Sequence, residues 1–88
     1  MKYDFIADPG HGWLKVPYRR IVDLGIQDRI SACSYVRGAF VYLEEDCDAG
    51  AFIRAAESAG ERVTFRERVA CVRASRVRGY ARYQGGAV

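Results

Sequence analysis

Apolar and polar residues alternate at the start of the chain in a pattern that predicts a β-hairpin. Apolar side chains alternate over residues 2–7, which indicates a short strand. Residues 8–12 read Asp-Pro-Gly-His-Gly, which is typical of a turn, because Asp bonds nearby backbone N–H groups, Pro fixes φ and Gly permits positive φ. A second apolar stretch over residues 13–16 predicts the returning strand.

The next segments predict a short helix followed by two strands. Pro17 stands where a helix would begin, and Gly25 is well placed to end it. The apolar face of this helix consists of Tyr18, Ile21, Val22 and Leu24. Residues 30–37 and 39–45 indicate two strands on either side of Gly38, and the second is apolar on both faces. We therefore expect it to be a central strand of the sheet.

A second helix and a basic strand follow. Asp46 or Asp48 is expected to cap this helix, and Gly60 to end it. Its apolar positions recur at helical spacing and are Phe52, Ala55, Ala56 and Ala59. Residues 62–69 then alternate, with Val63, Phe65 and Val69 on one face. This alternation predicts a half-buried strand with an arginine-rich outer face.

The tail beyond residue 73 alternates only loosely, and residues 84–88 are expected to fray. The resulting order, β-β-α-β-β-α-β, predicts an α+β fold. We expect residues 1–88 to form a single small domain, with a mostly antiparallel sheet of about five strands and one or two helices.

Composition agrees with one folded domain. Half of the 88 residues are hydrophobic and 12% are aromatic, so the chain carries enough apolar surface for a modest core. Neither a signal peptide nor a membrane span is evident, so we expect a cytoplasmic protein, either monomer or homodimer. The three cysteines (33, 47 and 71) are odd in number and share no short spacing, which favours reduced, mostly buried thiols.

The charges separate into an acidic and a basic block. Residues 44–61 hold six carboxylates against Arg54, and residues 62–88 hold seven arginines against Glu67. The candidate acidic binding patch consists of Glu44, Glu45, Asp46 and Asp48. The candidate basic face consists of Arg62, Arg66, Arg68, Arg73, Arg76 and Arg78, and we expect Tyr80 and Tyr83 beside it to stack on bases. This separation favours a domain that docks on a charged partner. The alternative is that the arginines neutralise the chain's own acidic block.

The chain's only histidine, His11, lies in the predicted turn, where it and Trp13 are candidate loop contacts for a partner. No neighbouring Cys, Ser or second His builds a catalytic or ligand set around it, so we expect neither a catalytic residue nor a metal site. The acidic run from residue 44 also lacks the spacing of a calcium loop. A helix N-terminus, which attracts negative charge, explains it without a cofactor.

Two segments carry a resemblance to a known family. Residues 5–17 (FIADPGHGWLKVP) and 42–49 (YLEEDCDA) resemble small proteins of phages, prophages and other mobile elements. The overall pattern is also similar to small anti-CRISPR proteins directed at type I systems, of the I-C kind. This resemblance implies a non-enzymatic inhibitor in a bacterial cytoplasm. It would occupy a surface of a CRISPR surveillance complex (Cascade) and block target-DNA recognition or nuclease recruitment.

Two other functions remain open at this point. A small nucleic-acid-binding or regulatory protein would use the arginine face directly and bind bare DNA or RNA in a salt-dependent way. An enzyme would be built around His11 with Asp8 or Glu44, and the change His11→Ala would abolish its activity. The net charge of +3 argues against wholesale DNA mimicry and favours blocking of a protein surface.

Overall fold

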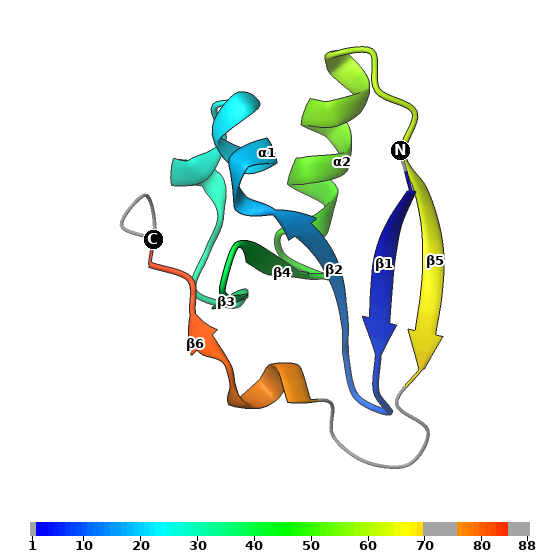
Figure 1. Cartoon of the computed structure of the whole chain (residues 1–88), viewed down its shortest axis with the longest axis vertical. Coiled ribbons are helices and arrows are strands. Elements are labelled where there is room, and N and C mark those ends of the chain that lie inside the picture. Colours follow the sequence, from blue (N-terminus) through cyan, green and yellow to red (C-terminus); the bar gives the residue numbers. More distant parts are fainter. Residues whose placement is uncertain (1, 70–75, 85–88) are drawn as a thin grey trace.

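A mixed sheet forms the framework of the protein in the computed structural model, which describes residues 2–69 and 76–84 (Figure 1). Within that part of the chain, six strands join in the order β5-β1-β2-β4-β3-β6. Their bounds are β1 Lys2–Ala7, β2 Gly12–Pro17, β3 Tyr35–Arg37, β4 Phe40–Glu44, β5 Thr64–Val69 and β6 Ala81–Arg82. Every neighbouring pair is antiparallel except β1 and β5. The predicted α+β class and mostly antiparallel sheet are therefore confirmed, with β6 added to the five expected strands.

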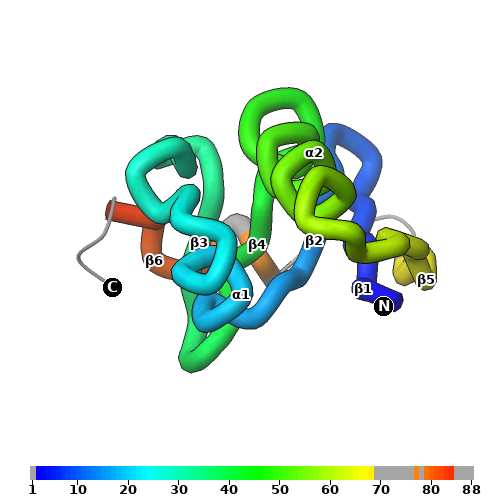
Figure 2. The backbone as a smooth tube through the Cα atoms, turned by 90° about the horizontal axis from the view of Figure 1, so that it is seen from above, coloured from blue at the N-terminus to red at the C-terminus, as the bar shows by residue number. Residues whose placement is uncertain are grey.

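The described residues also form two α-helices and two 3-10 helices. Their bounds are α1 Tyr18–Asp23, η1 Gln27–Arg29, α2 Ala49–Ser58 and η2 Arg76–Gly79. Figure 2 shows the order of the strands from above, with β5 and β1 at one side of the molecule and β6 at the other. The radius of gyration is 12.1 Å. A single compact domain of this length is expected to have a value of about 12 Å. No described helix is long and apolar enough to cross a membrane.

The core lies between α1, α2 and one face of the sheet. Leu14 and Val16 of β2, Val41 and Leu43 of β4, and Phe52 of α2 are all fully buried there. These strand residues are two apart, so they share one face of the sheet. β4 lies between β2 and β3, and the prediction of a central strand over 39–45 is confirmed. A smaller cluster of Trp13, Tyr42 and Val77 covers part of the opposite face.

The helix ends follow the predicted signals. Pro17 is the N-cap of α1, and the chain leaves α1 through Gly25 with φ 68°. α2 ends the same way, because Gly60 has φ 91°, a value that side chains with a Cβ rarely adopt.

The predicted strand over 30–37 is wrong at its start, because β3 begins only at Tyr35. Two serines divert the preceding segment. The backbone N–H and the hydroxyl of Ser31 and the hydroxyl of Ser34 donate to the carboxylate of Asp48. Side-chain bonds of this kind compete with the hydrogen bonds of a sheet and favour turns. Of the two predicted capping residues, Asp46 and Asp48, the structure places Asp48 at the N-cap position of α2. Its carboxylate, however, makes no capping hydrogen bond to the helix.

The predicted half-buried face of residues 62–69 is also wrong in part. Phe65 is 50% exposed, because β5 is an edge strand and an open groove lies between Phe65 and Ile53 of α2.

Tyr83, near the end of the described chain, is buried and donates its hydroxyl to the carbonyl oxygen of Gln27 at 2.6 Å. Tyr83 is therefore a core residue and is not available to stack on a base. Residues 85–88, most of the expected frayed tail, lie outside the described residues.

A polar network joins the end of α2 to β1 and α1. Tyr3 donates its hydroxyl to Glu61, which also pairs with Arg20 at 2.8 Å. Burial and the neighbouring carboxylate raise the pKa of Tyr3 to about 12. Burial alone would raise the pKa of Glu61, but the hydrogen bonds from Tyr3 and Arg20 outweigh it, and the net effect is a lowered pKa. The segment that leads into β5 is thereby fixed to the rest of the domain.

Candidate functional site

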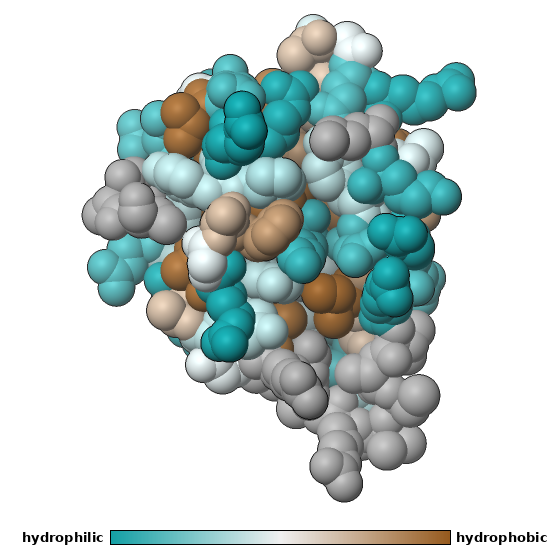
Figure 3. Space-filling view, in the orientation of Figure 1, coloured by the Kyte–Doolittle hydropathy of each residue, from teal (hydrophilic) through white to brown (hydrophobic). Residues whose placement is uncertain are grey.

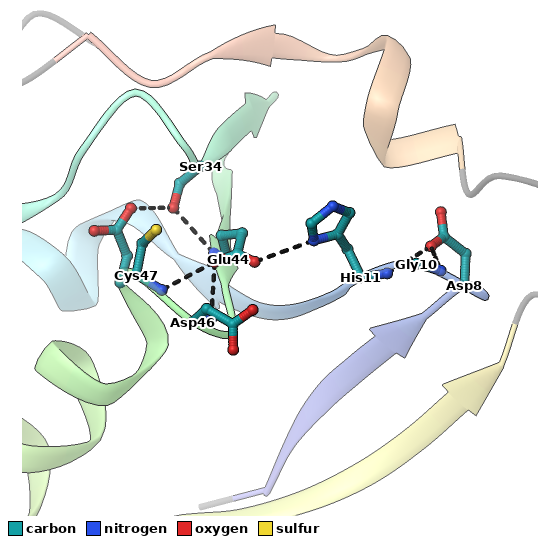
Figure 4. Close-up of polar contacts among 8 residues, drawn as sticks. Asp8, Gly10, His11, Ser34, Glu44, Asp46 and Cys47 are labelled. Carbon is teal, nitrogen blue, oxygen red and sulfur yellow. Dashed lines mark hydrogen bonds and ion pairs between the residues drawn. The ribbon is translucent and has the colours of Figure 1, made fainter.

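The turn before β2 holds His11 in place. The Asp8 carboxylate oxygen Oδ1 accepts the backbone N–H of Gly10 at 3.0 Å and that of His11 at 2.9 Å. The backbone N–H of Asp8 in turn donates to the carbonyl oxygen of His11. This is the local Asp turn that the sequence predicts. It places the imidazole beside the end of β4, 33 residues further along the chain (Figure 4).

Glu44, the last residue of β4, lies against this imidazole. The residue is only 7% exposed, and its Oε2 accepts the backbone N–H groups of Asp46 and Cys47 at 2.8 and 2.9 Å. Its other oxygen, Oε1, lies 3.3 Å from Nδ1 of His11. The backbone N–H of Glu44 donates to the hydroxyl of buried Ser34. The carboxylate is therefore held through Oε2 and the backbone through Ser34, with Oε1 facing His11 (Figure 4).

The candidate acidic patch is divided by the structure. Glu45 and Asp46 are exposed, whereas Glu44 and Asp48 are buried. Each buried carboxylate accepts hydrogen bonds from the chain itself, Glu44 from its own loop and Asp48 from the serines. Only two of the four predicted residues therefore present their charge to a partner. The sequence could not separate them, because all four fall within five consecutive positions at a strand-to-helix junction.

A cavity of about 370 Å³ opens over the His11–Glu44 pair. Its lining includes His11, Glu44, Asp46, Cys33 and Cys47. Cys33 and Cys47 are exposed and free, so the prediction of mostly buried thiols is wrong for both. A hydrogen bond with Cys33 and the neighbouring Glu44 carboxylate raise the pKa of the Cys47 thiol to about 12.

The other predicted loop contact, Trp13, is not at the surface. It is buried, with its ring 6.1 Å from that of His11 between ring centroids and 6.3 Å from that of Tyr35. The third cysteine, Cys71, lies outside the described residues. The cavity itself was missed from the sequence, because its residues come from segments that are separated along the chain and meet only in the folded sheet.

Three arginines of the basic face lie at or next to the β5 edge. The side chains of Arg66 and Arg68 are 56% and 58% exposed, and both approach the single carboxylate of Asp4, at 2.9 and 3.5 Å. The hydrogen bond from Arg66 and the nearby positive charges lower the pKa of Asp4. Arg62 is also exposed. Because two guanidinium groups share one carboxylate, the face of β5 that carries Arg66 and Arg68 keeps a net positive charge, whereas Glu67 lies on the opposite face.

The other three arginines predicted for the basic face lie away from β5 or outside the described residues. Arg76 and Arg78 belong to η2, which precedes β6 in the chain, and Arg73 lies outside the described residues. The structure therefore brings Arg66 and Arg68 together on one strand and assigns Arg76 and Arg78 to a different element.

An apolar groove runs between α2 and the β1–β5 side of the sheet. It has a volume of about 410 Å³ and is lined by Phe5, Leu14, Ala49, Ile53 and Phe65, with Glu45 and Glu67 beside them. Glu67 is on the same face of β5 as Phe65, because the two residues are two positions apart. We call this feature the α2 groove. The sequence missed it because the alternation of 62–69 assigned Phe65 to the core.

Comparison with known proteins adds no family to this description. No protein-family model, no curated protein and no solved structure matches the chain.

Proposed function

We propose that this protein is a non-enzymatic inhibitor of the anti-CRISPR type, which binds a type I surveillance complex and blocks target-DNA recognition or nuclease recruitment. It would act in the cytoplasm of a bacterial host, as a monomer or homodimer. The observation that carries the proposal is the α2 groove, in which a half-exposed aromatic ring lies beside two carboxylates. Such a groove supports a protein-binding function.

The groove has the anatomy of a binding interface. Large apolar side chains at the centre of an interface dominate its binding energy, and charged groups around them determine partner choice and the association rate. Phe65 is 50% exposed and lies over an apolar floor that includes Phe5 and Ile53. On the face shown in Figure 3, apolar surface occurs in small separated patches among hydrophilic side chains. A partner would therefore combine apolar and charged contacts.

The carboxylates beside the groove indicate the charge of that partner. Glu45 and Glu67 are both exposed and would pair with lysine or arginine. Protein surfaces that bind DNA are rich in these residues, since they neutralise phosphates. We propose that the groove receives an apolar side chain flanked by basic residues on the DNA-binding subunits of the complex. Occupying such a surface would exclude the target DNA.

The first test is size-exclusion chromatography of the protein with a purified type I surveillance complex, followed by target-DNA binding on the recovered fraction. Co-elution with loss of DNA binding supports blocked recognition, and co-elution with intact DNA binding supports blocked nuclease recruitment. Failure to co-elute with any of several type I complexes would refute the proposal.

Paired variants locate the interface. Phe65→Ala is expected to weaken binding about 30-fold, the effect of removing an interface residue that contributes about 2 kcal/mol. Phe40→Ala is the matched control, because Phe40 is the other exposed phenylalanine among the described residues and lies on β4, outside the groove. Equal effects of both changes would mean that the α2 groove is not the interface. Glu67→Lys, compared with Glu57→Lys on α2, tests the predicted charge of the partner.

A second function is favoured by the β5 edge. Arg66 and Arg68 both approach the Asp4 carboxylate, and their side chains are more than half exposed, so they are accessible to phosphate. A nucleic-acid-binding protein of this kind would bind bare DNA or RNA with an affinity that falls steeply with salt. Replacing both arginines by Gln would then reduce the slope of log affinity against log salt by about 2. The inhibitor proposal predicts little affinity for bare nucleic acid and no such change.

A further inference from the structure

Metal-binding atoms of three side chains converge at the end of β4. One ligand atom each of His11, Glu44 and Asp46 lies within 4.8 Å of the other two. The group borders the cavity of about 370 Å³, which leaves open space beside it. We propose that this group binds a divalent transition-metal ion of the Zn²⁺ type through the His11 imidazole and the two carboxylates. The proposal is independent of the inhibitor function.

The geometry of the first two ligands fits such an ion. A metal held tetrahedrally by nitrogen and oxygen at about 2.0–2.1 Å has its ligand atoms about 3.3 Å apart. Nδ1 of His11 and Oε1 of Glu44 are 3.3 Å apart. A carboxylate oxygen of Asp46 lies within 4.8 Å of the other two ligand atoms. Because Asp46 is exposed, rotation of its side chain can bring this oxygen to the bonding distance of the metal. The ligand positions therefore need little rearrangement of the backbone.

Glu44 makes the group more than a cluster of surface acids. Its side chain is only 9% exposed, and two backbone N–H groups hold Oε2. This arrangement corresponds to the outer hydrogen bonds that orient carboxylate ligands in metal sites. The other oxygen is left toward His11 and the cavity. The turn at Asp8 fixes the backbone of His11, and the imidazole already lies against Glu44 without a metal.

The donor types select the class of ion. One imidazole nitrogen with two carboxylates suits Zn²⁺ and related transition metals, whereas Ca²⁺ requires six to eight oxygen ligands. Three protein ligands leave coordination positions open to the cavity, as in zinc sites that also bind water or a small anion. Cys33 and Cys47 line the same cavity but are outside the three-atom group. The proposal therefore assigns the metal to nitrogen and oxygen, not to sulfur.

The test uses Co²⁺ as a spectroscopic substitute for Zn²⁺, added to protein freed of metal with a chelator. We expect saturation at one ion per chain, visible absorption of four- or five-coordinate cobalt, no thiolate-to-cobalt charge-transfer band, and displacement by Zn²⁺. Calorimetry with Zn²⁺ alone then gives the affinity. His11→Ala and Asp46→Asn each remove a direct ligand and should weaken Zn²⁺ binding at least about tenfold, because even the loss of an outer hydrogen bond to a ligand costs about that much.

The controls separate this site from other sources of metal binding. Glu45→Gln removes an exposed charge next to the group and should leave the affinity unchanged, as should Cys33→Ser and Cys47→Ser. Binding lost equally in Glu45→Gln would indicate diffuse attraction to acidic residues and would overturn the proposal. A charge-transfer band that disappears in the cysteine variants and persists in His11→Ala would also overturn it, as would absence of saturable binding. Circular dichroism of each metal-free variant checks that it folds.

Discussion

The buried carboxylate of Asp48 should be one of the strongest determinants of stability in this domain. Asp48 is 3% exposed and accepts hydrogen bonds from the Ser31 backbone N–H, the Ser31 hydroxyl and the Ser34 hydroxyl. The change Asp48→Ala removes the acceptor of all three hydrogen bonds at once. Ser34 is completely buried, so water cannot replace its lost partner, whereas Ser31 is exposed and can bond to solvent.

The magnitude follows from this difference in exposure. Leaving the buried Ser34 hydroxyl without an acceptor costs about 2 kcal/mol, and each of the two Ser31 bonds contributes about 0.5 kcal/mol net. The expected loss for Asp48→Ala is therefore about 3 kcal/mol, a large part of the roughly 5–10 kcal/mol that stabilises a domain of this size. Asp48→Asn keeps an acceptor and loses the negative charge beside the N-terminus of α2, so we expect a loss of about 1 kcal/mol.

Urea unfolding, followed by the fluorescence of the single, buried Trp13, measures these losses. With a slope of about 1 kcal/mol per molar urea, Asp48→Ala should lower the midpoint by about 3 M. Asp46→Ala is the matched control, performed without metal, because Asp46 is an exposed carboxylate in the same loop. It should change stability by no more than about 0.5 kcal/mol. Similar midpoints for Asp48→Ala and Asp46→Ala would refute the assignment of Asp48 as a structural residue.

Two further predictions concern the contacts that join distant segments. Glu61 has a lowered pKa in the folded protein, so its contribution to stability is present above the unfolded pKa of about 4.3 and is lost as the pH falls through the folded value. The urea midpoint should therefore fall as the pH is lowered from neutral to acidic, and it should fall less in Glu61→Gln than in the unchanged protein. Equal falls in both proteins would contradict the role of Tyr3 and Arg20 as partners of Glu61. Tyr83→Phe removes the hydroxyl that donates to the Gln27 carbonyl and should lower the free energy of unfolding by about 1 kcal/mol without changing the slope, as tested by the same titration.

Local signals in the sequence were sufficient for the turns and helix ends. Asp8 bonds the backbone N–H groups of Gly10 and His11, and Gly25 and Gly60 end their helices with positive φ. Each of these features depends on atoms only a few residues apart. Their outcome is therefore fixed by the backbone preferences of Gly and by the short side chain of Asp. The central strand was also recognisable locally, because its residues are apolar on both faces.

The candidate sites depended on contacts that no local pattern contains. His11 meets Glu44 because β2 pairs with β4, and Asp48 turns inward because Ser34 lies across from it. The α2 groove arises because the chain passes from β4 through α2 to β5, which returns along the edge of the sheet parallel to β1. In consequence Phe65 is exposed although the alternation of its strand marks it as apolar core.

By itself the sequence therefore determined the class of fold, the order of most elements, the turns and the existence of two oppositely charged segments. Only the tertiary structure decided which charges are buried, which thiols are exposed and which side chains meet around a cavity. The physical reason is the range of the interactions. Turn and helix signals act over a few residues, whereas the exposure of a carboxylate is set by the strands and loops that pack against it from elsewhere in the chain.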